Sequence, residues 1–345
     1  MRGLLPKHRP GLLLAPMQDV TDLPFMRLMA RHGGPDIFVT EYFRVHADSR
    51  LDPVILCSIT ENTTGIPVVA QMIGEDIPAL VRTARELQRH SVAGIDLNLG
   101  CPAPIVCRKD AGGGLLRHPE RINSILQALR DAVTTRLTVK CRIGYDSAAE
   151  FPGLLEVLQR HSLDGLAIHA RTVRDGYRTP VLPEAVRCAV SALSCPVVAN
   201  GNVVDVPTGV ALYRRTGAAG LMIGRGAIRN PWLFSQLRAH FENGTAPQPT
   251  GRDVFGYVQA LWEEIAACER RFHPQRHVAK MKKYLCYIAQ GADADAQFDF
   301  RIRRVREPEE FFRICREYLD HSEPFPATPP RSSVLFCGFA DLLAS

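Results

Sequence analysis

Long hydrophobic runs are missing from this sequence. No stretch of the 345 residues approaches the about 20 consecutive apolar residues that a helix needs to cross a membrane. Basic residues precede Leu12–Leu14 near the start, but this apolar run is far shorter than the apolar core of a signal peptide. We therefore expect a protein that is neither inserted in a membrane nor secreted, and a cytoplasmic location.

Regular cysteine spacing is also missing. The ten cysteines include no CxxC pair, no even framework and no Cys/His spacing typical of zinc sites. This pattern excludes a disulfide-rich secreted scaffold and a zinc module, and it indicates reduced thiols. We predict no metal site, and we expect most of the cysteines to fill the core as small apolar residues.

An excess of one charge is small over the whole chain but concentrated locally. The formal net charge of +6 does not separate a nucleic-acid-binding protein from an ordinary basic enzyme. Residues 270–283 contain six lysines and arginines and no acidic residue, and a second cluster comprises Arg301, Arg303, Arg304 and Arg306. These clusters are either a surface for nucleic acid or a solvated helix face, and charge alone does not decide between them.

What the sequence does have is an alternation of short apolar runs with amphipathic segments, and its 46% apolar content is enough for a large core. Such alternation indicates parallel strands joined by right-handed crossovers. Eight units in about 240 residues favour an α/β fold of the (β/α)8 TIM barrel type over an open, doubly wound sheet. The predicted strands are Leu12–Leu14, Ile37–Thr40, Val68–Met72, Gly94–Leu97, Leu137–Cys141, Gly165–His169, Val197–Ala199 and Gly220–Ile223.

The alternation ends near residue 242, and this change divides the chain into four parts. Residues 1–242 are predicted to form the barrel, and residues 243–252, rich in Gly, Pro and Thr, a linker. Residues 253–321 carry apolar side chains at helical spacing and are predicted to form a smaller C-terminal helical bundle. The tail, residues 322–345, is rich in Pro and Ser and has no predicted role.

A cysteine stands at the end of one predicted strand, in the segment Asp96–Pro102. Residues just after the strands of a barrel meet at one face, where catalytic groups collect. Cys101 is therefore a candidate nucleophile, metal ligand or acid, and Cys107 is a weaker competitor. No Cys-His pair has protease spacing, and an ordinary thiol is mostly protonated at neutral pH, which favours a proton donor.

Two glycine turns follow the last two predicted strands. Asn200–Asn202 and Gly224–Gly226 stand where barrels often bind phosphate, and an arginine between the two later glycines adds positive charge. Arg229 stands where a Rossmann turn has its last glycine, which disfavours a dinucleotide-binding domain. Lys140 and His169, at the ends of intermediate strands, are either solvated rim residues or groups that stabilise an electron-rich cofactor.

Taken together and in this order, these motifs resemble the tRNA-dihydrouridine synthase family, flavin enzymes with a barrel and a C-terminal helical domain. The resemblance covers residues 11–320. It is carried by Ala15–Met17 with Thr21–Asp22, Asn98–Pro102, Lys140–Arg142, His169–Thr172, Asn200–Gly201, and Gly224–Gly226 with Asn230–Trp232.

The resemblance implies a reaction and a role for each matched residue. NADPH would reduce a bound FMN, a hydride would pass from flavin N5 to C6 of a uracil in tRNA, and Cys101 would protonate C5. Asn98 and Arg171 would hold the uracil, and no stable protein partner is implied. Further substrate contacts would come from Arg142, Tyr177, Arg276, Lys280, Lys282 and Lys283. FMN would contact Pro16, Met17, Gln71, Lys140, His169, Asn200, Gly201, Asn202, Gly224 and Arg225.

Within the family, Thr40–Val45 and His277–Leu285 most resemble the bacterial subfamily that modifies position 16 of the D-loop. Three alternatives stay open. The first is a flavin barrel acting on a free pyrimidine or enone, for which the basic clusters would be superfluous. The others are an RNA-binding protein with vestigial flavin chemistry and a flavin- and folate-dependent RNA methyltransferase.

Overall fold

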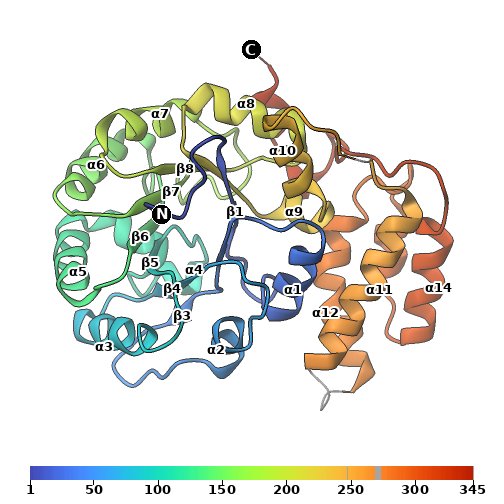
Figure 1. Ribbon diagram of the computed structural model, residues 1–345, viewed down its shortest axis with the longest axis horizontal. Coiled ribbons are helices and arrows are strands. Elements are labelled where there is room, and N and C mark those ends of the chain that lie inside the picture. Colours follow the sequence, from blue (N-terminus) through green and yellow to red (C-terminus); the bar gives the residue numbers. More distant parts are fainter. Residues whose placement is uncertain (247, 269–272, 345) are drawn as a thin grey trace.

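The short apolar runs form a closed parallel barrel in the computed structural model, which describes residues 1–246, 248–268 and 273–344 (Figure 1). The barrel strands are β1 (Gly11–Leu14), β2 (Ile37–Val39), β4 (Val68–Ile73), β5 (Gly94–Leu99), β6 (Leu137–Arg142), β7 (Gly165–His169), β8 (Val197–Asn200) and β9 (Gly220–Ile223). Because β2 pairs with both β1 and β4, the sheet closes on itself. The two-residue β3, Phe43–Arg44, pairs with the end of β4. All eight predicted strands, and the TIM barrel, are confirmed.

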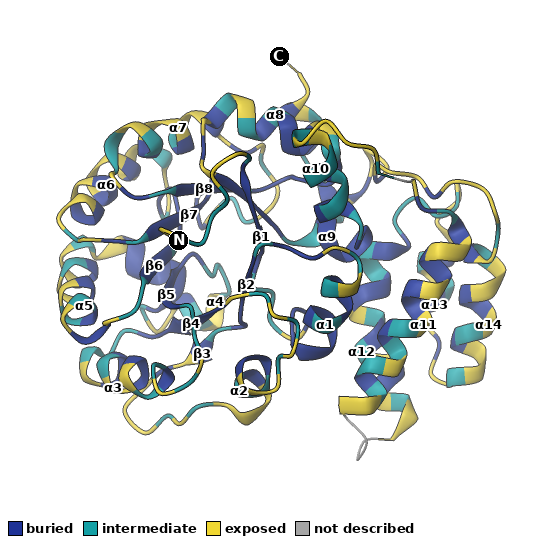
Figure 2. Cartoon of the chain, viewed as in Figure 1, coloured by how far each residue is buried: buried dark blue, intermediate teal, exposed yellow. Residues whose placement is uncertain are grey.

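Amphipathic segments between the strands form the helices around the barrel. They are α1 (Leu23–Arg31), α2 (Pro53–Thr60), α3 (Ile77–Leu87), α4 (Pro104–Cys107), α5 (Pro119–Ala132), α6 (Phe151–Gln159), α7 (Pro183–Ala192), α8 (Val206–Thr216), α9 (Arg225–Arg229) and α10 (Leu233–Phe241). Asp22, Asp76 and Asp205 cap the first turns of α1, α3 and α8, and each of these turns contains a proline. Figure 2 shows exposed outer helix faces around buried strands.

Four more helices, α11 (Gly251–Cys268), α12 (Pro274–Ile288), α13 (Gln297–Ile302) and α14 (Pro308–Leu319), stand beside the barrel (Figure 1). α12 is fastened to the loop after β1. Lys280 Nζ lies 2.5 Å from Asp22 Oδ2, and the Tyr284 hydroxyl donates to the Val20 carbonyl at 2.8 Å. Among the helices of the described residues, none has the length and apolar character to span a membrane.

The tail, which has no role predicted from the sequence, folds back onto the barrel. Its residues 323–344, named here the C-terminal strap, return from the helical bundle to the barrel (Figure 1, red). Buried Arg229 holds the start of the strap by donating to the carbonyls of Pro326 at 2.7 Å and Ala327 at 3.0 Å. Farther along, Phe336 and Phe339 pack in a small apolar cluster.

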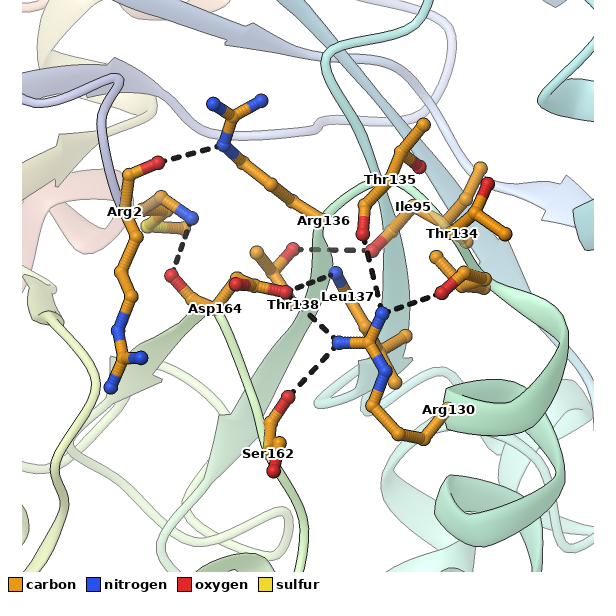
Figure 3. Close-up of polar contacts among 12 residues, drawn as sticks. Arg2, Ile95, Arg130, Thr134, Thr135, Arg136, Leu137, Thr138, Ser162 and Asp164 are labelled. Atoms are coloured by element: carbon orange, nitrogen blue, oxygen red, sulfur yellow. Dashed lines mark hydrogen bonds and ion pairs between the residues drawn. The ribbon is translucent and has the colours of Figure 1, made fainter.

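A polar network at the opposite end of the barrel joins the segments before β6 and β7 (Figure 3). Arg130 on α5 donates to Asp164 Oδ2 at 3.0 Å and to the Ser162 carbonyl at 2.9 Å. Asp164 also accepts the N–H of Leu137 at 3.0 Å. Partial burial acts to raise the pKa of Asp164, but the Leu137 N–H and Arg130 lower it overall. These contacts stabilise the barrel far from the rim where catalytic groups collect.

All ten cysteines lie within the described residues, and all are free thiols. Only Cys107, Cys141, Cys195 and Cys315 are buried. The expectation that most cysteines fill the core is therefore wrong, because the other six occupy half-buried or exposed positions.

Candidate active site

A cavity of about 480 Å³ opens at the carboxyl ends of the barrel strands, and its size suits a small-molecule cofactor or substrate. The predicted site residues on its wall are Pro16, Met17, Asn98, Cys101, Lys140, Arg142, His169, Tyr177, Asn200, Gly201, Asn202, Gly224 and Arg225. Cys101 and both glycine turns therefore line one cavity, although more than 90 residues separate them in the sequence.

Two residues predicted to touch the cofactor or the base lie behind this wall. Gln71 on β4 is fully buried, donates to Asp96 Oδ2 at 2.8 Å and accepts from Asn98 Nδ2 at 2.8 Å. Arg171 is also fully buried and donates to Asn202 Oδ1 at 3.1 Å. These contacts favour positioning roles for both side chains, and direct contact with FMN or uracil stays a prediction.

Several side chains hold the loop that carries Cys101, and Arg142 is one of them because its Nε donates to the Gly100 carbonyl at 2.9 Å. Asn98 Oδ1 accepts hydrogen bonds from the N–H groups of Gly100 and Cys101, each at 2.9 Å. Bonds of this kind, to the backbone two and three residues ahead, build a tight turn. Gly113 supports the loop from behind, since its N–H donates to the Cys101 carbonyl at 3.0 Å and a Cβ there would lie 2.8 Å from that oxygen. A larger residue at position 113 would displace the loop.

Cys107 and Tyr42 both lie close to Cys101. The competing Cys107 is buried, its thiol donates to the Cys101 carbonyl at 3.4 Å, and burial raises its pKa. Tyr42 lines the cavity and was not among the predicted site residues. Burial raises the pKa of Tyr42, and the nearby Cys101 thiol raises it further. Its place just after the predicted strand at residues 37–40 is the sequence signal that could have identified it.

Cations line the cavity, and none of the described residues that line it is an aspartate or a glutamate. Burial, with a smaller contribution from Arg142, lowers the pKa of Lys140 to about 8. Burial also lowers the pKa of His169 well below its ordinary value, with Arg142 and Lys140 adding to the effect, so the imidazole is neutral at neutral pH. Arg225 is buried enough that its pKa is lowered too. Such a potential attracts an anionic or electron-rich ligand.

The turn after β8 contains a hydrogen-bond donor without an acceptor. Asn202 is 5% exposed, and among the described residues its Nδ2 has no partner, whereas buried polar groups normally have one. The donors Lys140, Asn202 and Arg225, together with apolar Met17 and Ile223, form parts of one wall. This set fits FMN, whose ring system is largely apolar and whose carbonyl and phosphate oxygens accept hydrogen bonds.

The predicted RNA-contacting residues of α12 differ in their partners. Lys280 is 14% exposed and pairs with Asp22, and Lys283 pairs with Asp19 of the same loop at 3.1 Å. Lys282 has a lowered pKa because of partial burial and because Arg306 lies nearby. Arg276, the fourth predicted contact, is exposed. Two further basic positions, 270 and 271, lie outside the described residues.

Two of the four arginines in the second basic cluster form ion pairs with acidic residues. Arg301 forms an ion pair with Glu317, and Arg303 forms one with Asp299 at 2.7 Å. Arg304 lies 3.5 Å from the centre of the Phe300 ring. The positive surface is therefore smaller than the sequence indicates, and the close cations Lys282 and Arg306 stand out within it.

Comparison with known proteins decides what this cavity belongs to. A family model described as dihydrouridine synthase matches residues 13–322. The chain belongs to the dihydrouridine synthase family. Membership in this family makes it a flavin-dependent oxidoreductase, as the sequence predicted.

Several bacterial relatives align with this chain over nearly their whole length. A tRNA-dihydrouridine(16) synthase of Neisseria meningitidis serogroup A is 30% identical, with 91% of this chain and 96% of the relative covered. A tRNA-dihydrouridine(16) synthase of Cupriavidus necator is 31% identical, with 88% of this chain and 95% of the relative covered. A tRNA-dihydrouridine synthase B of Xanthomonas axonopodis pv. citri is 31% identical, with 90% of this chain and 93% of the relative covered. The names of the first two relatives confirm the predicted likeness to the position-16 subfamily.

A solved structure shares the fold over part of this chain. Histamine dehydrogenase from Rhizobium sp. 4-9 superposes with a TM-score of 0.53 at 13% identity, covering 74% of this chain and 50% of that one. This likeness concerns the fold.

Proposed function

We propose that this protein reduces a D-loop uridine of tRNA, at position 16, to dihydrouridine, with FMN as its cofactor, NADPH as reductant and Cys101 as proton donor. The observation that carries the proposal is the shared cavity, in which Cys101 and the donors of the two glycine turns line one space. The names of the relatives support the substrate and the position. A tRNA substrate also agrees with the cytoplasmic location expected from the sequence.

The residues around the cavity suit the two halves of such a reduction. Reduced FMN, when bound, supplies the hydride that adds to uracil C6. Cys101 then transfers its thiol proton to C5, so that one hydride and one proton complete the addition across the C=C bond. Asn98 fixes the backbone of the thiol loop, and Tyr42 beside the thiol is placed to return a proton to it. Lys140 and Arg225 would hold the electron-rich ring and the phosphate of FMN, respectively.

The helical bundle carries cations that are suited to binding an RNA substrate. Lys282 on α12 and Arg306, just after α13, are close cations. Arg276 is exposed six residues, about 1.7 turns, before Lys282. Tyr287, later on the same helix, lines the cavity. A strand of RNA held along α12 would therefore lead toward the site. A base must leave its stack to enter, and an unpaired loop base does so at small cost.

The proton-donor role is tested with Cys101→Ala, and Cys107→Ala is the matched control because its thiol points at the Cys101 carbonyl. We expect Cys101→Ala to bind FMN and to be reduced by NADPH at the normal rate, but to lose dihydrouridine formation by about 100-fold or more. Cys107→Ala should keep all three properties. Retention of product formation by Cys101→Ala removes the proposed role, and a colourless protein that takes up no FMN removes the whole proposal.

A further inference from the structure

The C-terminal strap, residues 323–344, begins just beyond the segment that matches the dihydrouridine synthase family, residues 13–322. It nevertheless forms part of the cavity wall, to which it contributes Val334, Leu335 and Phe336. The wall of the candidate flavin site is therefore completed by residues outside the shared family region.

Polar contacts fix the strap at several points before it reaches the cavity. Beyond the carbonyls held by Arg229, Thr328 donates to Asp205 Oδ2 at 2.6 Å and Ser333 donates to Gln290 Oε1 at 2.7 Å. Phe336 is 1% exposed and packs edge-to-face on Tyr287 of α12, with the ring centres 6.1 Å apart. The strap thus bridges α12 and the barrel rim.

Two cations of the site bind carbonyl groups of the strap. Arg225, in the glycine turn after β9, donates to the Leu335 carbonyl. Its guanidinium carbon lies 4.6 Å from the centre of the Tyr177 ring and 6.0 Å from the centre of the Phe336 ring. Arg171, behind the wall, donates weakly to the Cys337 carbonyl at 3.4 Å. A guanidinium has five N–H donors, so one bond to Leu335 orients Arg225 and leaves further donors for a phosphate.

We propose that the strap is a structural part of the cofactor site that orients Arg225 toward the phosphate of the flavin nucleotide and slows its release, an inference that rests on the proposed FMN function. The hydrogen-bond donors around the strap favour its role as a wall of the cofactor site over that of an inhibitory segment that occupies the phosphate position. Asn202 Nδ2 keeps no partner although Gly338 of the strap lies beside it. The strap offers carbonyl groups to Arg225 and Arg171, and neither of its two carboxylates, Glu323 and Asp341, lines the cavity. An inhibitory segment that imitated phosphate would bring an acidic side chain.

The test compares FMN with riboflavin, which lacks the phosphate, in the purified full-length protein. Three variants are needed: a chain ending at Ser322, Phe336→Ala, and Leu343→Ala as the control in an exposed strap residue. Flavin affinity and release are followed by flavin fluorescence. We expect the chain ending at Ser322 to bind FMN about 10- to 100-fold more weakly, the range for losing the orientation of a charged hydrogen-bond donor, with riboflavin affinity changed less than about 3-fold.

Phe336→Ala keeps the backbone of the strap and gives an answer even where the shortened chain does not fold. It should release FMN about 3- to 10-fold faster, and this effect should vanish when Arg225→Ala is combined with it, because both changes act through one guanidinium. Equal FMN affinity in all variants, tighter binding after truncation, or equal losses for FMN and riboflavin overturn the inference. A full-length protein that binds no FMN instead overturns the proposed function.

Discussion

Lys280 tests whether the basic residues of α12 contact RNA or hold the protein together. The sequence places Lys280 with Lys282 and Lys283 in one basic cluster, whereas the structure pairs it with Asp22, the N-cap of α1. Asp22 is 8% exposed in this pair. We therefore expect Lys280→Ala to loosen the attachment of α12 to the barrel. Lys282→Ala, the matched control two residues along on the opposite side of the helix, should weaken RNA binding.

The expected magnitude follows from the burial of the pair. Removing one partner of a buried ion pair costs about 3–5 kcal/mol, because a charge stays behind without its partner. Slight exposure of both side chains reduces this, so we expect about 2–4 kcal/mol of lost stability for Lys280→Ala. Because the entropy of unfolding grows with chain length, each kcal/mol lowers Tm by only about 1–2 °C in a chain of 345 residues. Lys282→Ala should change Tm by less than about 1 °C.

The assay pairs thermal melting with tRNA binding at several salt concentrations. Lys282→Ala should lower the slope of log affinity against log salt by about one, the effect of one lost phosphate contact. Lys280→Ala should leave that slope unchanged. Adding Asp22→Asn should restore about half of the lost stability, since the amide still caps α1 and carries no charge. A normal Tm together with a reduced salt slope for Lys280→Ala would refute this reasoning.

Three further outcomes are expected. Burial lowers the pKa of Lys140 to about 8, so raising the pH through 8 removes its charge, and affinity for reduced flavin should fall above pH 8. In a pH titration both Lys140→Arg, which stays charged, and Lys140→Met, which carries no charge, should abolish that fall, with Lys140→Arg keeping the higher affinity throughout. Gly113→Ala should slow dihydrouridine formation by about 10- to 100-fold at an unchanged rate of flavin reduction, while Gly153→Ala, where a Cβ meets nothing, should match the wild type. Asp164 has a lowered pKa, so the stability that its carboxylate contributes is present above its ordinary pKa and is lost as the pH falls through the lowered value. Denaturant unfolding should show Asp164→Asn to be about 1 kcal/mol less stable than the wild type at pH 7, and this difference should fade below about pH 4.

The fold was predictable because each strand has its own local signal. Apolar runs such as Val68–Met72 and Gly165–His169 are bounded by turns and separated by helical periodicity, and the closure of eight parallel strands follows from their number. The sequence also carries signals for α1, because Asp22 caps this helix and a proline follows in its first turn. Local chemistry thus suffices for elements, and the strand count suffices for their arrangement.

The sequence predicts a site residue well where its position in a strand fixes the direction of its side chain. It predicts less well where a side chain could form hydrogen bonds with several different partners. Cys101, Lys140 and His169 follow or end strands, and the barrel alone brings them to one cavity. Gln71 also lies on a strand, but its amide is taken by Asp96 and Asn98, a choice that depends on packing beneath the wall. Such partner choices have no signal at the level of spacing.

Contacts between distant parts of the chain could not be predicted from the sequence, and they matter for function because they hold the catalytic rim. Lys280 meets Asp22 across 258 residues, and Arg225 meets Leu335 across 110. In both cases a segment after the barrel holds a loop that follows a barrel strand: α12 holds the loop after β1, and the strap holds the turn after β9. Loops at the rim of a barrel are intrinsically mobile, whereas catalysis needs groups fixed within about 1 Å. The bundle and the strap therefore act as a frame for the catalytic rim, and residues 1–242 alone should hold FMN more weakly than the full chain.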